Sequence, residues 1–101
     1  MIVAISISPS GADESGGVSE AVADAVRVIR DSGLPNETNA MFTNIEGEWD
    51  EVMAVVKRAV FRVAESSPRV GLVLKADLRR GYETGQLTAK VDRVEAQLRD
   101  E

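Results

Sequence analysis

The chain has 101 residues, of which 44% are hydrophobic and 4% aromatic, and it carries a formal net charge of −5 at neutral pH. A chain of this length supports one modest hydrophobic core, so we expect a single domain spanning residues 1–101. The net negative charge argues against a nucleic-acid partner, because affinity for the phosphate backbone comes largely from Lys and Arg side chains.

The sequence contains neither cysteine nor histidine. This excludes disulfides and thiolate zinc sites, and it removes the commonest general base and metal ligand. We therefore expect a protein that is not an enzyme and that has no metal site and no cofactor. The apolar start, Met1 to Ile7, is too short for a signal peptide, and no run approaches the roughly 20 apolar residues of a membrane span. A cytoplasmic location without membrane contact is the resulting expectation.

Alternating side chains over Ile2–Ser8 predict a half-buried first strand. One face of this strand is fully apolar and consists of Val3, Ile5 and Ile7. The other face is less apolar and consists of Ile2, Ala4, Ser6 and Ser8. The following segment, Pro9–Gly17, is rich in turn residues and predicts a loop.

A first helix is predicted after this loop, with Ser19 as its N-cap and Gly33 as its left-handed stop. Its apolar stripe at i, i+3, i+4 and i+7 consists of Val22, Ala25, Val26 and Ile29. Glu37–Thr43 then predicts a second strand and Thr43–Glu48 a short third one, and we expect the two to form a hairpin that turns at Asn44.

The second helix has the strongest pattern in the sequence. Its start, Glu48 to Glu51, resembles an acidic capping box, and Trp49 is expected to hold this start onto the core. The apolar stripe continues almost to Ser66 and consists of Val52, Val55, Val56, Ala59, Val60 and Val63. Phe61 lies on the opposite side of the helix. It is either an isolated apolar residue on the surface or part of a contact with another subunit.

The last third of the chain predicts one more strand and one more helix. Val70–Leu78 has one apolar face, and its other face turns polar at Lys75 and Asp77. Arg79–Gly85 predicts a polar loop. The amphipathic helix that follows has a stripe at i, i+4, i+7 and i+11, which consists of Leu87, Val91, Val94 and Leu98.

The order of these elements is strand, helix, strand, strand, helix, strand, helix. It predicts an α+β fold with a ferredoxin-like βαββαβ antiparallel sheet, two long helices on one face and an additional C-terminal helix. The other sheet face carries Ile2, Ala4 and Val73 and would be poorly solvated. We therefore expect the third helix or a second subunit to cover part of it.

Several segments in the chain match a family pattern in the same order. They are Ile2 to Pro9, Ser32 to Leu34, Met41 to Gly47, Asp50 to Met53, Lys75 to Asp77 and the pair Arg79-Arg80. The most specific is Thr43-x-Ile45-Glu46-Gly47 followed directly by a helix. Together these segments, which span nearly the whole chain, resemble the small thiamine-binding family related to YkoF.

The resemblance implies a ferredoxin-like fold, assembly into dimers or tetramers, and binding of thiamine or its hydroxymethylpyrimidine part without chemistry on it. By position, the family's central motif falls on Thr43, Ile45, Glu46 and Gly47, and the strand that neighbours it carries Lys75 and Asp77. Phe42 stands where relatives usually have glycine, so it either narrows the pocket or stacks on a flat ring.

A thiamine site needs a carboxylate, amide or hydroxyl partners and an apolar or aromatic wall. The candidate polar groups are Glu46, Asp77, Asn39, Thr43, Ser6 and Ser8, and the candidate wall residues are Met41, Phe42 and Trp49. Purely structural roles are also available. Glu46 can be a turn carboxylate bonded to nearby amides, and Lys75 with Asp77 can be a surface ion pair.

Our hypothesis from the sequence is non-enzymatic binding of a small cationic heteroaromatic ligand, with thiamine or its hydroxymethylpyrimidine moiety expected, for carriage, buffering or sensing. The alternative is an oligomeric structural or regulatory module, without a small-molecule ligand, whose open sheet face serves only assembly. A hydrolase with Glu46 and Asp77 as paired acids is a third interpretation, although their spacing is not diagnostic.

Overall fold

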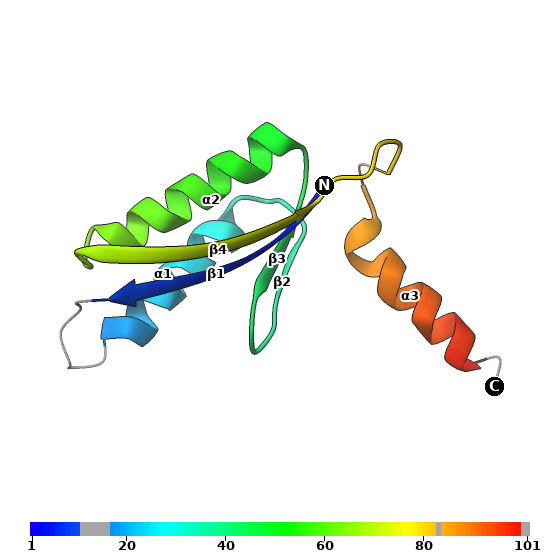
Figure 1. Cartoon of the computed structure of the whole chain (residues 1–101), viewed down its shortest axis with the longest axis horizontal. Helices are drawn as coiled ribbons and strands as arrows, with labels where there is room; N and C mark the ends of the chain where they lie inside the picture. Colours follow the sequence, from blue (N-terminus) through cyan, green and yellow to red (C-terminus); the bar gives the residue numbers. More distant parts are fainter. Residues whose placement is uncertain (11–16, 83, 100–101) are drawn as a thin grey trace.

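The computed structural model describes residues 1–10, 17–82 and 84–99, and its elements follow the predicted order. They are β1 (Ile2–Ser10), α1 (Gly17–Asp31), β2 (Asn36–Thr38), β3 (Thr43–Glu46), α2 (Trp49–Ala64), β4 (Arg69–Asp77) and α3 (Gln86–Arg99). The sheet is antiparallel with the order β2-β3-β1-β4, so the predicted ferredoxin-like fold is confirmed. Figure 1 shows that α3 extends away from the other elements.

The core lies between one face of the sheet and the helices α1 and α2. The predicted apolar face of β1 is buried there, since Val3 is 0% exposed and Ile5 2% exposed. The helices contribute the buried residues Ala21, Ala25, Ile29, Val52, Val55, Val56, Ala59 and Val63. Burial of these stripes stabilises both helices, because an amphipathic helix depends on tertiary packing of its apolar face.

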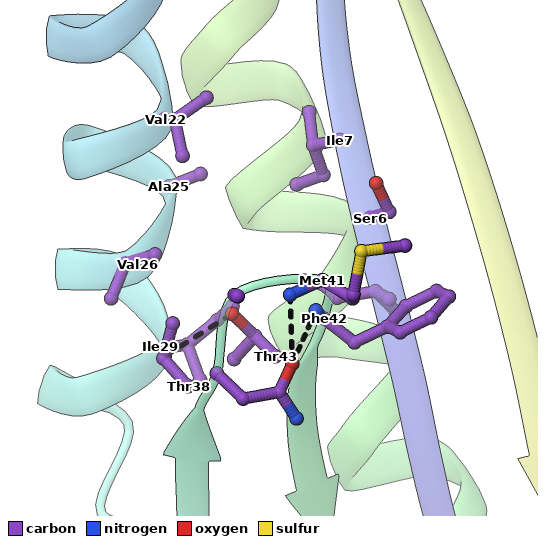
Figure 2. A pocket seen from close by; sticks show the side chains of 13 residues that line it. Ser6, Ile7, Val22, Ala25, Val26, Ile29, Thr38, Met41, Phe42 and Thr43 are labelled. Atoms are coloured by element: carbon purple, nitrogen blue, oxygen red, sulfur yellow. Dashed lines mark hydrogen bonds between the residues drawn. The ribbon is translucent and has the colours of Figure 1, made fainter.

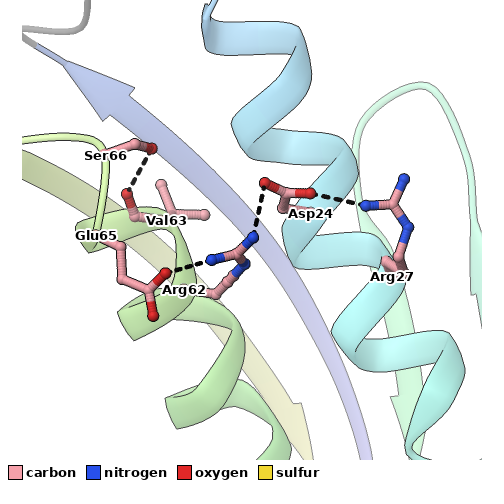
Figure 3. A network of polar contacts seen from close by, with 6 residues as sticks. All are labelled: Asp24, Arg27, Arg62, Val63, Glu65 and Ser66. Atoms are coloured by element: carbon pink, nitrogen blue, oxygen red, sulfur yellow. Dashed lines mark hydrogen bonds and ion pairs between the residues drawn. The ribbon is translucent and has the colours of Figure 1, made fainter.

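A surface network of ion pairs also connects the two long helices (Figure 3). Arg62 of α2 lies 3.6 Å from Asp24 of α1 and pairs with Glu65, while Asp24 accepts a 2.8 Å hydrogen bond from Arg27. Each of these side chains is at least 34% exposed. Exposed pairs typically contribute less than about 1 kcal/mol, so the placement of α1 against α2 depends mainly on the buried core.

The helix ends match the predictions only in part. Gly33 adopts the left-handed conformation, with φ of 81°, and the predicted stop of α1 is confirmed. The predicted N-cap Ser19 is wrong, because α1 already begins at Gly17. One cap residue contributes only about 1 kcal/mol, so a good capping residue does not by itself fix where a helix begins. Glu48 is the N-cap of α2 but makes no side-chain capping bond, so no capping box forms. Trp49 is 55% exposed and does not hold the helix onto the core.

The hairpin turns earlier than predicted. The predicted second strand is present, but its predicted end at Thr43 is wrong, because β2 ends at Thr38 and the residues between it and β3 form the connecting loop. Asn39 Oδ1 accepts hydrogen bonds from the backbone N–H groups of Met41 and Phe42, both at 2.9 Å, and this closes the turn. The predicted turn residue Asn44 lies inside β3 instead, because pairing of β3 with β1 fixes where that strand begins.

The remaining strands agree with the predicted faces. Ile5 pairs with Leu74 and Ser6 with Val73, so the apolar face of β4 meets the helices and its polar face lies on the open side. β1 continues to Ser10, which makes Pro9 part of the strand, and the rest of the predicted loop, residues 11–16, lies outside the described residues. Across the described ranges, none of the helices has the length and apolar character required to cross a bilayer.

Candidate functional site

The structure divides the predicted site residues between the two faces of the sheet. Side chains alternate along each strand, and the pairing of Ile5 with Thr43 places that threonine on the helix side. Ile45 shares this side, whereas Glu46 lies on the open face together with Asp77. The predicted set therefore does not converge on one pocket.

Five of the predicted residues meet in a cleft between α1 and the β2–β3 hairpin, which we call the hairpin cleft. They are Ser6, Asn39, Met41, Phe42 and Thr43. The other lining residues are Ile5, Ile7, Thr38, Ala40 and, from α1, Val22, Ala25, Val26 and Ile29. Figure 2 shows α1 on one side of this cleft, with Ser6, Met41 and Phe42 on the other. None of the lining residues is charged.

The polar groups of the hairpin cleft gather at the hairpin and at the edge of β1. Thr38 Oγ1 and Thr43 Oγ1 lie 3.2 Å apart and share a hydrogen bond, and Thr43 is only 7% exposed. β3 pairs with β1 only as far as Ile5, so beyond this residue the edge of β1 borders the cleft at Ser6. These hydroxyl and backbone groups can pair with the donor and acceptor edge of a flat heterocycle.

The size of the hairpin cleft limits what it can hold. Its volume is about 140 Å³. A dry protein cavity of about 150 Å³ takes up one benzene molecule, whereas pockets for drug-sized ligands occupy roughly 300–1,000 Å³. The cleft is therefore suited to a single aromatic ring, and its uncharged lining favours a ring without a net charge.

Lys75 and Asp77 lie on the opposite side of the sheet, in a second cleft of about 420 Å³ that we call the open-face cleft. The first turns of α3 form its roof with Gln86, Leu87, Lys90 and Val91. The predicted ion pair between Lys75 and Asp77 is replaced by one between Lys90 of α3 and Asp77. The floor of the open-face cleft includes Ile2, Ala4, Glu37 and Asn44.

The ion pair with Lys90 holds the pKa of Asp77 below its ordinary value of 3.8, first through the hydrogen bond and then through the charge of Lys90. Because this pKa is lowered in the folded state, the stabilisation from the ion pair is fully present above the ordinary carboxyl pKa and is lost as the pH falls through the lowered pKa.

We expect Lys90→Ala to raise the Asp77 midpoint in an NMR pH titration. Lys75→Ala, which removes a weaker influence, should raise it less, and equal midpoints in all three proteins would contradict this assignment.

Glu46 has a defined structural partner. Glu46 is buried, with only 3% of its surface exposed. Its two carboxylate oxygens accept hydrogen bonds from the backbone N–H groups of Gly85 (3.1 Å) and Gln86 (2.7 Å). Gln86 is the first residue of α3. The carboxylate therefore caps the positive end of α3 and fastens this helix to β3.

Three further predicted residues have other surroundings. Ile45 is 0% exposed in the core, and Ser8 is exposed on the open face opposite Gly71. A Cβ atom at Gly47 would lie 3.1 Å from Cγ2 of Val52, so the glycine permits the end of β3 to pack closely against α2. These positions contribute to the architecture around the sheet.

Sequence reasoning missed the α1 wall of the hairpin cleft. Of the predicted apolar stripe of α1, Ala25 and Ile29 are buried in the core, whereas Val22 is 37% exposed and Val26 is half-buried. Thr38 was placed in the second strand without a site role. No local pattern distinguishes a core stripe from a cleft wall, since both consist of apolar residues at helical spacing.

The fold and the hairpin cleft define a small ferredoxin-like protein with an uncharged recess between α1 and the β2–β3 hairpin. The sequence profile of the family described as thiamine-binding protein matches residues 3–95, so the chain belongs to this family. A UPF0045 protein of Mycobacterium bovis is 56% identical over 99 residues, which cover 97% of this chain and 94% of the relative. A UPF0045 protein of Methanocaldococcus jannaschii is 37% identical over 83 residues, covering 82% and 81% respectively.

Solved structures support the same fold. The crystal structure of the Methanocaldococcus jannaschii protein MJ1052, described as hypothetical, has a TM-score of 0.79 at 34% identity. The aligned part covers 93% of this chain and 94% of the MJ1052 chain. A candidate thiamine biosynthesis or salvage protein of Thermotoga maritima also has a TM-score of 0.79, at 27% identity, with 92% and 96% covered. The predicted family resemblance is thereby confirmed.

Proposed function

We propose that the protein binds thiamine or its hydroxymethylpyrimidine part in the hairpin cleft and leaves the ligand chemically unchanged. The observation that supports this most directly is an uncharged, hydroxyl-lined recess of about 140 Å³ that contains Thr43, one of the positions on which the resemblance places the family's central motif. Its lining has no carboxylate, amine, imidazole or thiol to act as a general acid or base near neutral pH. Binding for carriage, buffering or sensing fits this lining.

The proposed orientation places the pyrimidine ring inside and the cationic thiazolium ring outside. Moving an unpaired cation into an uncharged, largely apolar recess is costly, whereas the neutral pyrimidine needs only hydrogen-bonding partners. Phe42 is half-buried and lines the cleft, where an aromatic face can attract the thiazolium charge. Glu46 and Asp77 are on the other side of the sheet and are not needed for this arrangement.

Calorimetric titration with thiamine, its phosphates, hydroxymethylpyrimidine and the isolated thiazole tests the proposal. We expect saturable binding of every pyrimidine-containing ligand and no binding of the thiazole alone. Thr43→Val keeps the shape of the side chain but removes its hydroxyl, so affinity should fall about three- to tenfold, the scale of one neutral hydrogen bond. Val22→Phe should fill the recess from its exposed rim and abolish binding.

Thr88→Val on the exposed surface of α3 is the matched control and should leave affinity unchanged. Circular dichroism confirms that each variant remains folded. Absence of heat with all pyrimidine ligands would contradict the function, and unchanged binding by Val22→Phe would contradict the placement in the hairpin cleft.

A further inference from the structure

The open-face cleft has an excess of positive charge at its β4 end, although the whole chain carries a net charge of −5. Lys75 and Lys90 line this cleft, and Arg79 lines a small notch that adjoins it. Lys90 is neutralised by its ion pair with Asp77. Within the part of the chain that the structure describes, neither Lys75 nor Arg79 forms an ion pair. Two cations are therefore available to an anion from outside the chain.

The sheet and an aromatic ring set the positions of these two cations. Lys75 of β4 pairs with Ala4 of β1, so its side chain begins beside a small residue of the cleft floor. The guanidinium of Arg79 lies over the ring of Tyr82, 3.7 Å from the ring centroid. This cation–π contact retains the positive charge and restricts the side chain. Both cations thus lie at the same end of the cleft.

The β2 end of the open-face cleft has the opposite character. Asn44 of β3 pairs with Ala4 on one side and with Glu37 of β2 on the other. Its Nδ2 donates a 3.0 Å hydrogen bond to Oε1 of Glu37. Since neighbouring strands lie about 4.8 Å apart, the backbones of Asn44 and Lys75 are separated by about 10 Å, with Ala4 between them. The cleft therefore has an acidic end and a basic end.

Between these two ends the cleft is apolar. Ile2 and Ala4 form the middle of its floor, and Leu87 and Val91 of α3 lie in its roof. Its volume of about 420 Å³ falls within the roughly 300–1,000 Å³ of pockets that hold small organic molecules. A body of one or two rings can therefore lie between floor and roof and remove apolar surface from water.

We propose that the open-face cleft is a second binding site, which takes a small organic anion with a carboxylate or phosphate group on an apolar body. The acid group lies at Lys75, and the body lies over Ala4 beneath the first turns of α3. The reverse orientation is unfavourable because Glu37 would repel the anion. Thiamine carries a positive charge, so this site differs from the hairpin cleft in ligand class as well as in position. The inference does not rest on the proposed function.

NMR titration of the isotope-labelled full chain with phenyl phosphate, benzoate, benzyl alcohol and benzylammonium tests the inference. We expect saturable shifts with at least one of the two anions, centred on Ala4, Lys75 and Leu87, and dissociation constants in the millimolar range of one-ring ligands. The anion that binds more tightly identifies the acid group. Benzyl alcohol and benzylammonium should bind at least about fivefold more weakly, because neither can pair with a cation.

Variants of Lys75 separate a specific contact from general attraction. Lys75→Ala should weaken binding of the tighter anion about fivefold, whereas Lys75→Arg retains the charge and should stay within about twofold of the wild type. Lys57→Ala on the exposed surface of α2 is the matched control, because it removes the same charge at a different place and should leave affinity unchanged. Saturating thiamine should not displace the anion.

Three results overturn the inference. The first is the absence of saturable shifts with both anions. The second is an equal loss of affinity in Lys75→Ala and Lys57→Ala, which indicates attraction to any positive charge. The third is displacement of the anion by thiamine, which indicates one shared site. Anion binding by a chain that binds no pyrimidine ligand would contradict the proposed function and support this inference.

Discussion

Glu46→Ala is expected to release the start of α3 from the sheet and to lower the free energy of unfolding by about 1–3 kcal/mol, the scale of hydrogen bonds to a charged group. The wild-type carboxylate accepts the backbone N–H groups of Gly85 and Gln86, and alanine offers no acceptor. Because most of α3 lacks other contacts in its own chain, the loss should concentrate in this helix.

Amide hydrogen exchange measured by residue, combined with urea unfolding, checks this prediction. Amide exchange in α3 is expected to become much faster. Exchange in the core strands should become faster only by the amount that follows from the lower global free energy of unfolding. Glu46→Gln retains one acceptor oxygen and should have an intermediate effect. Glu48→Ala is the matched control, because Glu48 is exposed and makes no side-chain capping bond.

The same variant also decides the role that the family resemblance implies for Glu46. If the ligand occupies the hairpin cleft, affinity for hydroxymethylpyrimidine should be unchanged in Glu46→Ala at temperatures where the protein is folded. A tenfold loss of affinity with normal exchange in α3 would instead identify Glu46 as a ligand-binding residue and would move the proposed site to the open face.

Ile45→Ala is expected to produce the largest loss of stability, about 2–5 kcal/mol. Ile45 is 0% exposed and belongs to the core cluster with Val3 and Val52, so truncation removes apolar contacts and leaves a cavity. Against a typical stability of about 5–15 kcal/mol, this is a large fraction. The midpoint of urea unfolding should fall accordingly.

Leu78→Ala serves as the matched control for Ile45→Ala. Leu78 is 64% exposed, and its truncation should change the free energy of unfolding by no more than about 0.5 kcal/mol. Because the Ile45 side chain has no exposed surface, the folded fraction of Ile45→Ala should bind ligand with normal affinity. Reduced affinity together with unchanged stability would contradict the core role of this residue.

The residues of the segment Thr43 to Gly47, on which the resemblance places the family's central motif, serve several different physical purposes. Thr43 lines the hairpin cleft, Ile45 fills the core, Glu46 caps α3, and Gly47 permits close packing against α2. Only the first of these positions faces the proposed ligand. A strand motif can therefore support a binding site largely by positioning the elements around it.

Local periodicity determined much of the fold. The alternation of Val3 and Ile5 identified the buried face of the first strand, the valine stripe identified α2, and Gly33 identified the end of α1. These features depend on neighbours within a few residues, where the chain geometry is fixed by strand or helix period. The order of elements then left few topologies, and the ferredoxin-like sheet was among them.

Tertiary structure decided the hairpin turn and the composition of the site. The turn lies at Asn39 because β3 pairs with β1, and Asp77 binds Lys90 because α3 folds back over the sheet at its start. Glu46 binds amides 39 and 40 residues further along the chain. Strand register and the path of α3 bring these groups together, and neither is encoded in the residues adjacent to them.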